Sequence, residues 1–368
     1  MLFRSGLKKT PWIIGGVALL ALGGFGAAIA TTLMGVNLFI GILAAILAFF
    51  LIGVGVSMSG TSLLALLAKG VSDERRAAAA TTVWLMMIFG FALTSGLAGK
   101  FLDPYAPEKV ILISGVISVV AIAITSLALY RLEGVDLENK IINTNQKVPF
   151  KTALKEILTD PDTKRFTIFI FLSMLAFSAQ DLILEPFAGI IFKYTLGETT
   201  SLSGIQHSGV LTGMLLVAVC GSSRLRRFFG SLRSWMIYGC LASALAMFGL
   251  VIAGILEGEW PLRLNVFILG LANGAFSIAA IASMMRLAVV GGSGKEGVRI
   301  GLWGGAQAIA FGLGGLLGAA ASDLARSLFA NAAWAYASVF FLEAILFVAS
   351  AYMASLVERK SSNEIKVG

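Results

Sequence analysis

The sequence predicts an all-α, polytopic membrane protein, a helical bundle of about ten transmembrane helices. Of the 368 residues, 58% are hydrophobic and only 13% are charged, whereas soluble domains average about 45–50% apolar and about 25% charged residues. The apolar residues form runs of about 20, which is the length that a helix needs to cross a bilayer. The alternation of polar and apolar residues typical of a membrane β-barrel is absent from the sequence.

The ten apolar runs give the expected helices in chain order. They cover residues 11–34, 37–67, 77–99, 108–130, 164–191, 204–223, 233–256, 262–289, 298–322 and 332–356. The first run follows Arg4, Lys8 and Lys9, as a signal peptide would, but it is long and rich in glycine, and a second run follows at once. We therefore expect an uncleaved span. The 42 glycines against 7 prolines fit helices that pack through small residues.

The basic residues predict which loops face the cytoplasm. All but five of the 28 lysines and arginines lie at the N-terminus, in alternate loops or in the C-terminal tail. The five exceptions are Lys100, Lys109, Lys193, Arg263 and Arg326. Because cationic loops resist translocation, both termini are expected in the cytoplasm. The net charge of +8 therefore reflects membrane topology, so membrane lipid is an expected partner and nucleic acid is not.

The longest polar stretch divides the chain into two groups of helices. We expect an N-terminal half-bundle of four helices at residues 1–131, a cytoplasmic linker with a short amphipathic helix at 132–162, a C-terminal six-helix bundle at 163–357 and a cytoplasmic tail at 358–368. Four helices before the linker and six after it are unequal halves.

A repeated glycine pattern indicates that the two groups share one fold. Phe-Gly, five residues and Gly occurs twice, about 222 residues apart, and a basic turn recurs at a similar offset. The glycines are Gly90, Gly96, Gly312 and Gly318, to which we assign a structural or gating role. Transporters use such tandem repeats. The first group then lacks two helices, so either Met1 is a misassigned start or the chain is a shortened paralogue.

The fifth expected helix carries the most informative polar residues, Gln180, Asp181 and Glu185, followed by Pro186. Carboxylates at positions i and i+4 lie on one face of a helix, about 6 Å apart. Ionisable groups inside a membrane are costly, which favours a functional role. Pro186 predicts a kink or an early helix end. The alternative is a carboxylate pair that is solvated at the outer interface or caps the helix.

Two further polar residues are candidates for the same site. His207, the single histidine, is expected at the start of the sixth helix, either as a ligand of a chlorophyll magnesium or as a polar anchor at the interface. Glu343 lies near the middle of the last helix, where a carboxyl group is expected to be protonated or paired.

No enzyme chemistry has a site in this sequence. It contains no phosphate-binding loop, HExxH, CxxC or GxSxG motif, and Cys220 and Cys240 lack metal-ligand spacing. We therefore predict no catalytic residue, no metal site and no enzyme.

These motifs together resemble the bacteriochlorophyll delivery branch of the major facilitator superfamily, the PucC and LhaA type proteins of phototrophs. The matching segments are QDLILEPFAG at residues 180–189 with Thr199, Thr200, Leu202 and Gly209, DERR at 73–76 before VWLMM at 83–87, and LDPYAPEKV at 102–110. The cytoplasmic loop motif of the superfamily is present as Gly221, Arg227, Gly230 and Arg233, without its usual acidic residue. The family has twelve spans, so the missing pair is its first two.

The resemblance implies a protein that delivers chlorophyll or bacteriochlorophyll to antenna or photosystem apoproteins, or helps those complexes assemble. It also implies that the protein binds or transports the pigment, and that it lies in the thylakoid or inner membrane of a phototroph. A proton-coupled secondary transporter of a small solute, using Glu185 or Glu343, is the alternative. An inactive truncated relic is a third hypothesis.

The topology can be tested with single cysteines introduced at positions 145 and 331, in place of Asn145 and Asn331, in a variant in which Cys220 and Cys240 are alanine. Because the two positions are assigned to opposite sides of the membrane, an impermeant thiol reagent should label the cysteine at position 145 from the cytoplasmic side. The cysteine at position 331 should be labelled from the other side. Labelling of both from the same side would refute the assignment.

Overall fold

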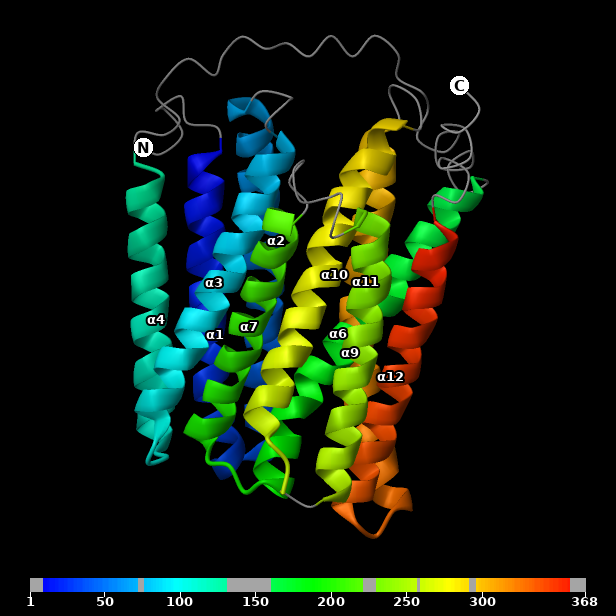
Figure 1. Cartoon of the computed structure of the whole chain (residues 1–368). Coiled ribbons are helices and arrows are strands. Elements are labelled where there is room, and N and C mark those ends of the chain that lie inside the picture. The colour runs from blue at the N-terminus through cyan, green and yellow to red at the C-terminus, as the bar shows by residue number, and fades with distance from the viewer. Residues whose placement is uncertain are drawn as a thin grey trace, which may run out of the picture. The chain divides into compact units, whose positions relative to one another are not determined.

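A computed structural model describes residues 9–71, 76–130, 160–220, 230–256, 259–290 and 296–357, and ten long helices account for nearly all of them. The helices are α1 (Thr10–Val36), α2 (Leu38–Gly70), α3 (Arg76–Leu102), α4 (Pro107–Ala128), α6 (Pro161–Ile191), α7 (Leu196–Cys220), α9 (Leu232–Ile255), α10 (Leu262–Val290), α11 (Glu296–Leu328) and α12 (Ala332–Leu356) (Figure 1). All ten are long and apolar enough to cross a membrane. The predicted all-α architecture is confirmed. The linker helix and the tail lie outside the described residues.

Side-chain caps set several helix starts. Asp160 accepts a hydrogen bond from the amide of Thr163 at 3.2 Å, and Pro161 occupies the first turn, so α6 begins at Pro161 rather than at 164. The start expected for the next helix, at 204, is wrong by two turns. Thr195 and Glu198 cap each other's amides at 3.2 and 3.0 Å, and α7 therefore begins at Leu196.

The first compact unit contains α1, α2, α4 and the two ends of α3. Its helices approach through small residues: a Cβ added to Gly16 of α1 would lie 2.6 Å from the amide nitrogen of Ser59 on α2. Ser118 of α4 donates a hydrogen bond to the carbonyl of Ala21 at 3.1 Å. Much of the apolar surface of α2 and α4 stays uncovered, for example Phe50, which is 65% exposed. Such surface is ordinary where lipid is the solvent.

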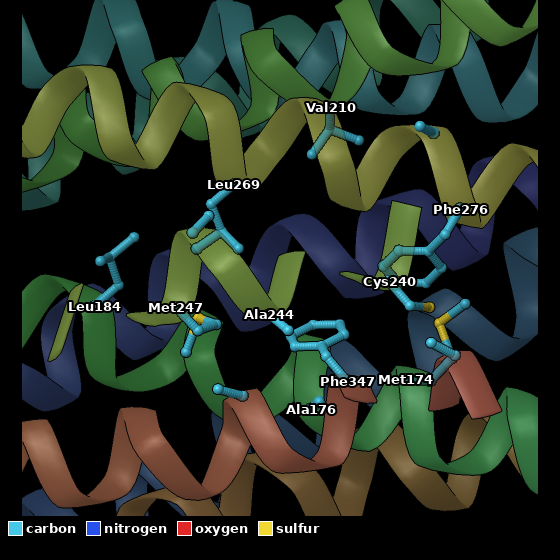
Figure 2. Close-up of a cluster of buried hydrophobic side chains, with 14 of the residues drawn as sticks. Met174, Ala176, Leu184, Val210, Cys240, Ala244, Met247, Leu269, Phe276 and Phe347 are labelled. Atoms are coloured by element: carbon cyan, nitrogen blue, oxygen red, sulfur yellow. The ribbon is translucent and has the colours of Figure 1, made fainter. Parts of the chain in front are cut away.

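The second unit contains the central part of α3, residues 81–99, together with α6, α7 and α9 to α12. Within it α7 packs on α10, α9 on α10 and α12, and α6 on α11 and α12. A continuous apolar core lies among these helices, and Figure 2 shows part of it, with Met174, Ala176, Leu184, Val210, Cys240, Ala244, Met247, Leu269, Phe276 and Phe347. Phe187 anchors α6 in this core, since its ring meets that of Phe340 edge to face with centroids 4.9 Å apart.

The division of the chain differs from the expected one at α3. The sequence suggested a boundary in the linker, whereas residues 81–99 pack with the second unit. The reason is a close crossing with α7: a Cβ added to Gly204 would lie 2.8 Å from the amide nitrogen of Gly96, and one added to Gly99 would lie 2.6 Å from the carbonyl oxygen of Gly197. Small residues on both helices allow this approach.

The structure supports the tandem repeat. The starts of α1, α2, α3 and α4 precede those of α9, α10, α11 and α12 by about 220–225 residues. Equivalent helices also pack alike, because α1 contacts α2 and α4 just as α9 contacts α10 and α12. In the described part of the chain, α6 and α7 have no counterparts in the first unit. Whether two further helices precede Met1 stays a prediction.

The α7–α10 contact yields a stability prediction with an internal control. A Cβ added at Gly274 would overlap the carbonyl oxygen of Val210, which belongs to rigid helical backbone, while one added at Gly304 of α11 meets nothing within 4 Å. Gly274→Ala should therefore lower the free energy of unfolding in detergent by about 1–3 kcal/mol, the usual cost of overpacking. Gly304→Ala should leave it unchanged or slightly raised. Equal melting temperatures for the two variants would contradict the close contact.

Candidate functional site

The two carboxylates of α6 face polar side chains of α7. Gln206 donates from Nε2 to Oδ1 of Asp181 at 2.9 Å, and Ser203 donates from its hydroxyl to Oε1 of Glu185 at 2.5 Å. Since the two helices run in opposite directions here, the i, i+4 pair on α6 meets an i, i+3 pair on α7. The predicted pair therefore does lie on one face, and each carboxylate has one neutral hydrogen-bond donor. We call Asp181, Glu185, Ser203, Gln206 and His207 the α6–α7 polar cluster.

The cluster is open on one side. Asp181 is exposed and Glu185 half-buried, whereas Gln206 is only 1% exposed. Leu182, next to Asp181 on α6, is 52% exposed, but its side chain lies on the side of α6 that faces Gly315 of α11. Pro186 follows directly, and α6 continues past it to Ile191, so the alternative of an early helix end is wrong.

His207 lies in the same cluster, three turns inside α7 rather than at its start. Its Nδ1 lies 2.8 Å from the carbonyl oxygen of Ser203. Its ring meets the ring of Phe91 on α3 edge to face, with centroids 5.3 Å apart and an interplanar angle of 79°. The structure thus places His207 on the same part of α7 as Ser203 and Gln206, which bind the two carboxylates.

Gln180 does not join this cluster, because the residue next to it on a helix points about 100° away. It is 1% exposed, and its Oε1 accepts a hydrogen bond from Nδ2 of Asn273 at 3.1 Å. Asn273 in turn accepts from the hydroxyl of Ser243 at 2.8 Å. This buried network joins α6, α10 and α9. The Nε2 of Gln180 has no hydrogen-bond partner among the described residues.

Glu343 stands apart from both polar groups. It lies on α12, is 3% exposed and has no hydrogen-bond partner for either carboxyl oxygen among the described residues. Ionisable groups inside a membrane are costly, which makes a buried carboxyl without a partner a candidate functional residue. Glu343 is therefore a separate candidate rather than part of the α6–α7 polar cluster.

The glycines assigned to gating have different environments. A Cβ added to Gly90 of α3 or Gly312 of α11 would meet no atom within 4 Å, whereas one added to Gly318 would lie 3.0 Å from the backbone of Ala179. Gly96 lies at the α3–α7 crossing. Packing therefore explains Gly96 and Gly318, and the structure gives no packing reason for the other two.

Half of the predicted cytoplasmic loop motif can be placed. Gly221 and Arg227 lie outside the described residues. Gly230 has φ of +87°, a left-handed conformation that favours glycine, just before the cap of α9. The guanidinium of Arg233 donates to the carbonyl of Ser355 near the end of α12. These two residues therefore fix the start of α9 against α12.

Sequence reasoning missed four partners of the site: Ser203, Gln206, Ser243 and Asn273. Each is a neutral polar residue inside an apolar helix, and that exception to the composition was the available signal. Among the described residues no group of three potential metal ligands occurs.

Comparison with known proteins gives the family. The sequence model of the PUCC protein family matches residues 3–362. The chain is 46% identical over 360 residues to the bacteriochlorophyll synthase 44.5 kDa chain of Rhodobacter capsulatus, covering 96% of this chain and 81% of that protein. It is 28% identical to protein PucC of Rhodobacter capsulatus, covering 96% of this chain and 78% of that protein.

Solved structures agree on the fold. The fucose:proton symporter FucP of E. coli matches with a TM-score of 0.57 at 14% identity, covering 96% of this chain and 85% of that one. FucP in the outward conformation, described as a major facilitator superfamily transporter, matches with a TM-score of 0.56 at 15% identity, covering 96% of this chain and 84% of that one. At this identity only the fold is shared. The chain has the major facilitator fold and belongs to the PUCC protein family.

Proposed function

We propose that this protein handles chlorophyll or bacteriochlorophyll in the membrane of a phototroph, delivering the pigment to antenna or photosystem apoproteins or helping those complexes assemble. Family membership supports a pigment-related role, because a relative of 46% identity carries bacteriochlorophyll in its name. The role is non-enzymatic: the major facilitator fold is a carrier fold. The thylakoid or inner membrane is the proposed location, with both termini in the cytoplasm.

The observation that carries the proposal is the chemistry of the α6–α7 polar cluster. A magnesium tetrapyrrole is a large apolar disc with one metal ion that accepts oxygen or nitrogen ligands. The cluster offers both kinds of ligand beside apolar surface, since Phe91, whose ring contacts His207, is 48% exposed. Ser203 and Gln206 each occupy one oxygen of a carboxylate, which leaves the second oxygen for a magnesium-bound water or a group of an apoprotein.

Proton-coupled transport of a small solute is the second candidate function. Glu343 favours it, because a buried carboxyl without a hydrogen-bond partner can take up and release a proton when its surroundings change. No cation pairs with it among the described residues. An inactive relic would need neither Glu343 nor the α6–α7 polar cluster.

The absorption spectrum of the purified protein separates the candidates. Protein extracted from a phototroph in mild detergent should carry chlorophyll-type pigment, or antenna subunits, in a stable ratio through size-exclusion chromatography. A solute carrier or a relic should elute without them. Pigment that washes out completely at low detergent concentration would refute the proposal.

The carboxylates can be tested in cells. Asp181→Asn together with Glu185→Gln keeps the size of both side chains and removes both charges. Under the proposed function this double variant should lower the accumulation of antenna or photosystem complexes severalfold, while the membrane level of the protein itself stays unchanged. Whole-cell absorption spectra and immunoblots measure the two quantities.

Asp323→Asn is the matched control, because this carboxylate lies on α11, is 72% exposed and pairs with Arg326 outside the cluster. It should leave pigment–protein accumulation at the wild-type level. Normal accumulation in the double variant would leave Asp181 and Glu185 as a polar cluster without a role in pigment handling.

A further inference from the structure

His207 is held in one tautomer by the backbone of α7. Its Nδ1 lies 2.8 Å from the carbonyl oxygen of Ser203, one helical turn earlier. A carbonyl oxygen only accepts hydrogen bonds, so Nδ1 must carry the proton. In the neutral imidazole the lone pair then lies on Nε2, and the ring is fixed with that nitrogen turned away from the helix backbone.

The Nε2 of His207 has no hydrogen-bond partner within the part of the chain that the structure describes. The ring of His207 contacts the ring of Phe91 edge to face. Asp181 is also near, but its Oδ1 already accepts a hydrogen bond from Gln206. Because Nε2 has no partner among the described residues and is not fully buried, a ligand can reach it. The site therefore favours a ligand that accepts an electron pair or donates a hydrogen bond.

The number of protein ligands at the site indicates which kind of metal-containing ligand His207 can bind. A zinc ion needs three or more protein ligands, and no group of three His, Cys, Asp or Glu side chains that could supply them occurs among the described residues. The magnesium of a tetrapyrrole already has four ring nitrogens and needs only one axial ligand. A single imidazole whose second nitrogen is fixed by a backbone carbonyl is the usual arrangement of a metal-binding histidine.

We propose that Nε2 of His207 is the axial ligand of the magnesium in a bound chlorophyll-type pigment, with Phe91 packing beside it. The proposal rests on the pigment-handling function above and assigns the residue that binds the metal. Asp181 and Glu185 then hold polar groups of the same pigment or its bound water, and are not metal ligands. Magnesium-free pigment has no reason to bind at His207.

The test compares binding of bacteriochlorophyll a and of bacteriopheophytin a, its magnesium-free counterpart, to purified full-length protein in detergent. Wild-type protein should prefer bacteriochlorophyll at least about tenfold, which corresponds to about 1.4 kcal/mol. His207→Leu should lose this preference, because the side chain has no lone pair. His207→Gly should lose it as well and regain it when imidazole is added to the buffer. The Qx absorption band, which reports axial coordination of the magnesium, should shift in parallel.

Ser208→Ala is the control, since this neighbouring residue is exposed and its hydroxyl bonds only within α7, to the carbonyl of Gly204 at 2.8 Å. It should bind as wild type does. A His207→Leu variant that keeps both the preference and the Qx position would overturn the ligand assignment and leave the pigment-handling function intact. Wild-type protein that binds neither pigment would overturn both.

Discussion

Helices in lipid gain little from hiding apolar surface from one another, so their contacts depend on how closely their backbones approach. In the second unit α7 and α10 approach closely, because Gly209 and Gly213 of α7 lie against the backbone of Phe267 and Leu271. In turn, Gly270 and Gly274 of α10 lie against the backbone of Gln206 and Val210. This contact fixes the rotation of α7 about its axis. With positions 209 and 213 turned to α10, positions 203 and 207 are turned elsewhere, toward the carboxylates of α6. The orientation of the polar cluster is thus a consequence of glycine packing on another face of the same part of α7.

The helices were predictable because the bilayer makes length and apolar content nearly sufficient to identify a span. The residues at which the helices begin and end were less predictable. Residues 195–203 contain several polar side chains, which the sequence suggested to be a loop, yet mutual capping by Thr195 and Glu198 starts α7 there. Seen from the sequence, a polar first turn and a loop have the same composition, and only the hydrogen bonds of the cap distinguish them.

The carboxylate pair on α6 was predictable for a local reason, since a spacing of four residues fixes a shared helix face. Its partners were not, because the pairing of Asp181 with Gln206 depends on which helices are neighbours and how far each is shifted along its axis. The same holds for α3. Its sequence belongs to the first group of helices, but its glycines at 96 and 99 match those of α7, and residues 81–99 therefore pack with the second unit.

Gln180 and Asp181, which are adjacent on α6, belong to two different polar groups. Gln180 faces the interior, where Asn273 and Ser243 complete a neutral hydrogen-bonded chain across three helices. Such a chain stabilises one arrangement of α6, α9 and α10 without introducing charge into the core. Asp181, one residue later, is carried by the helical rotation to the open side, where a charge is less costly. The neutral network fixes the rotation of α6, and this rotation turns both Asp181 and Glu185 toward α7. Their orientation therefore does not depend on their own hydrogen bonds to α7.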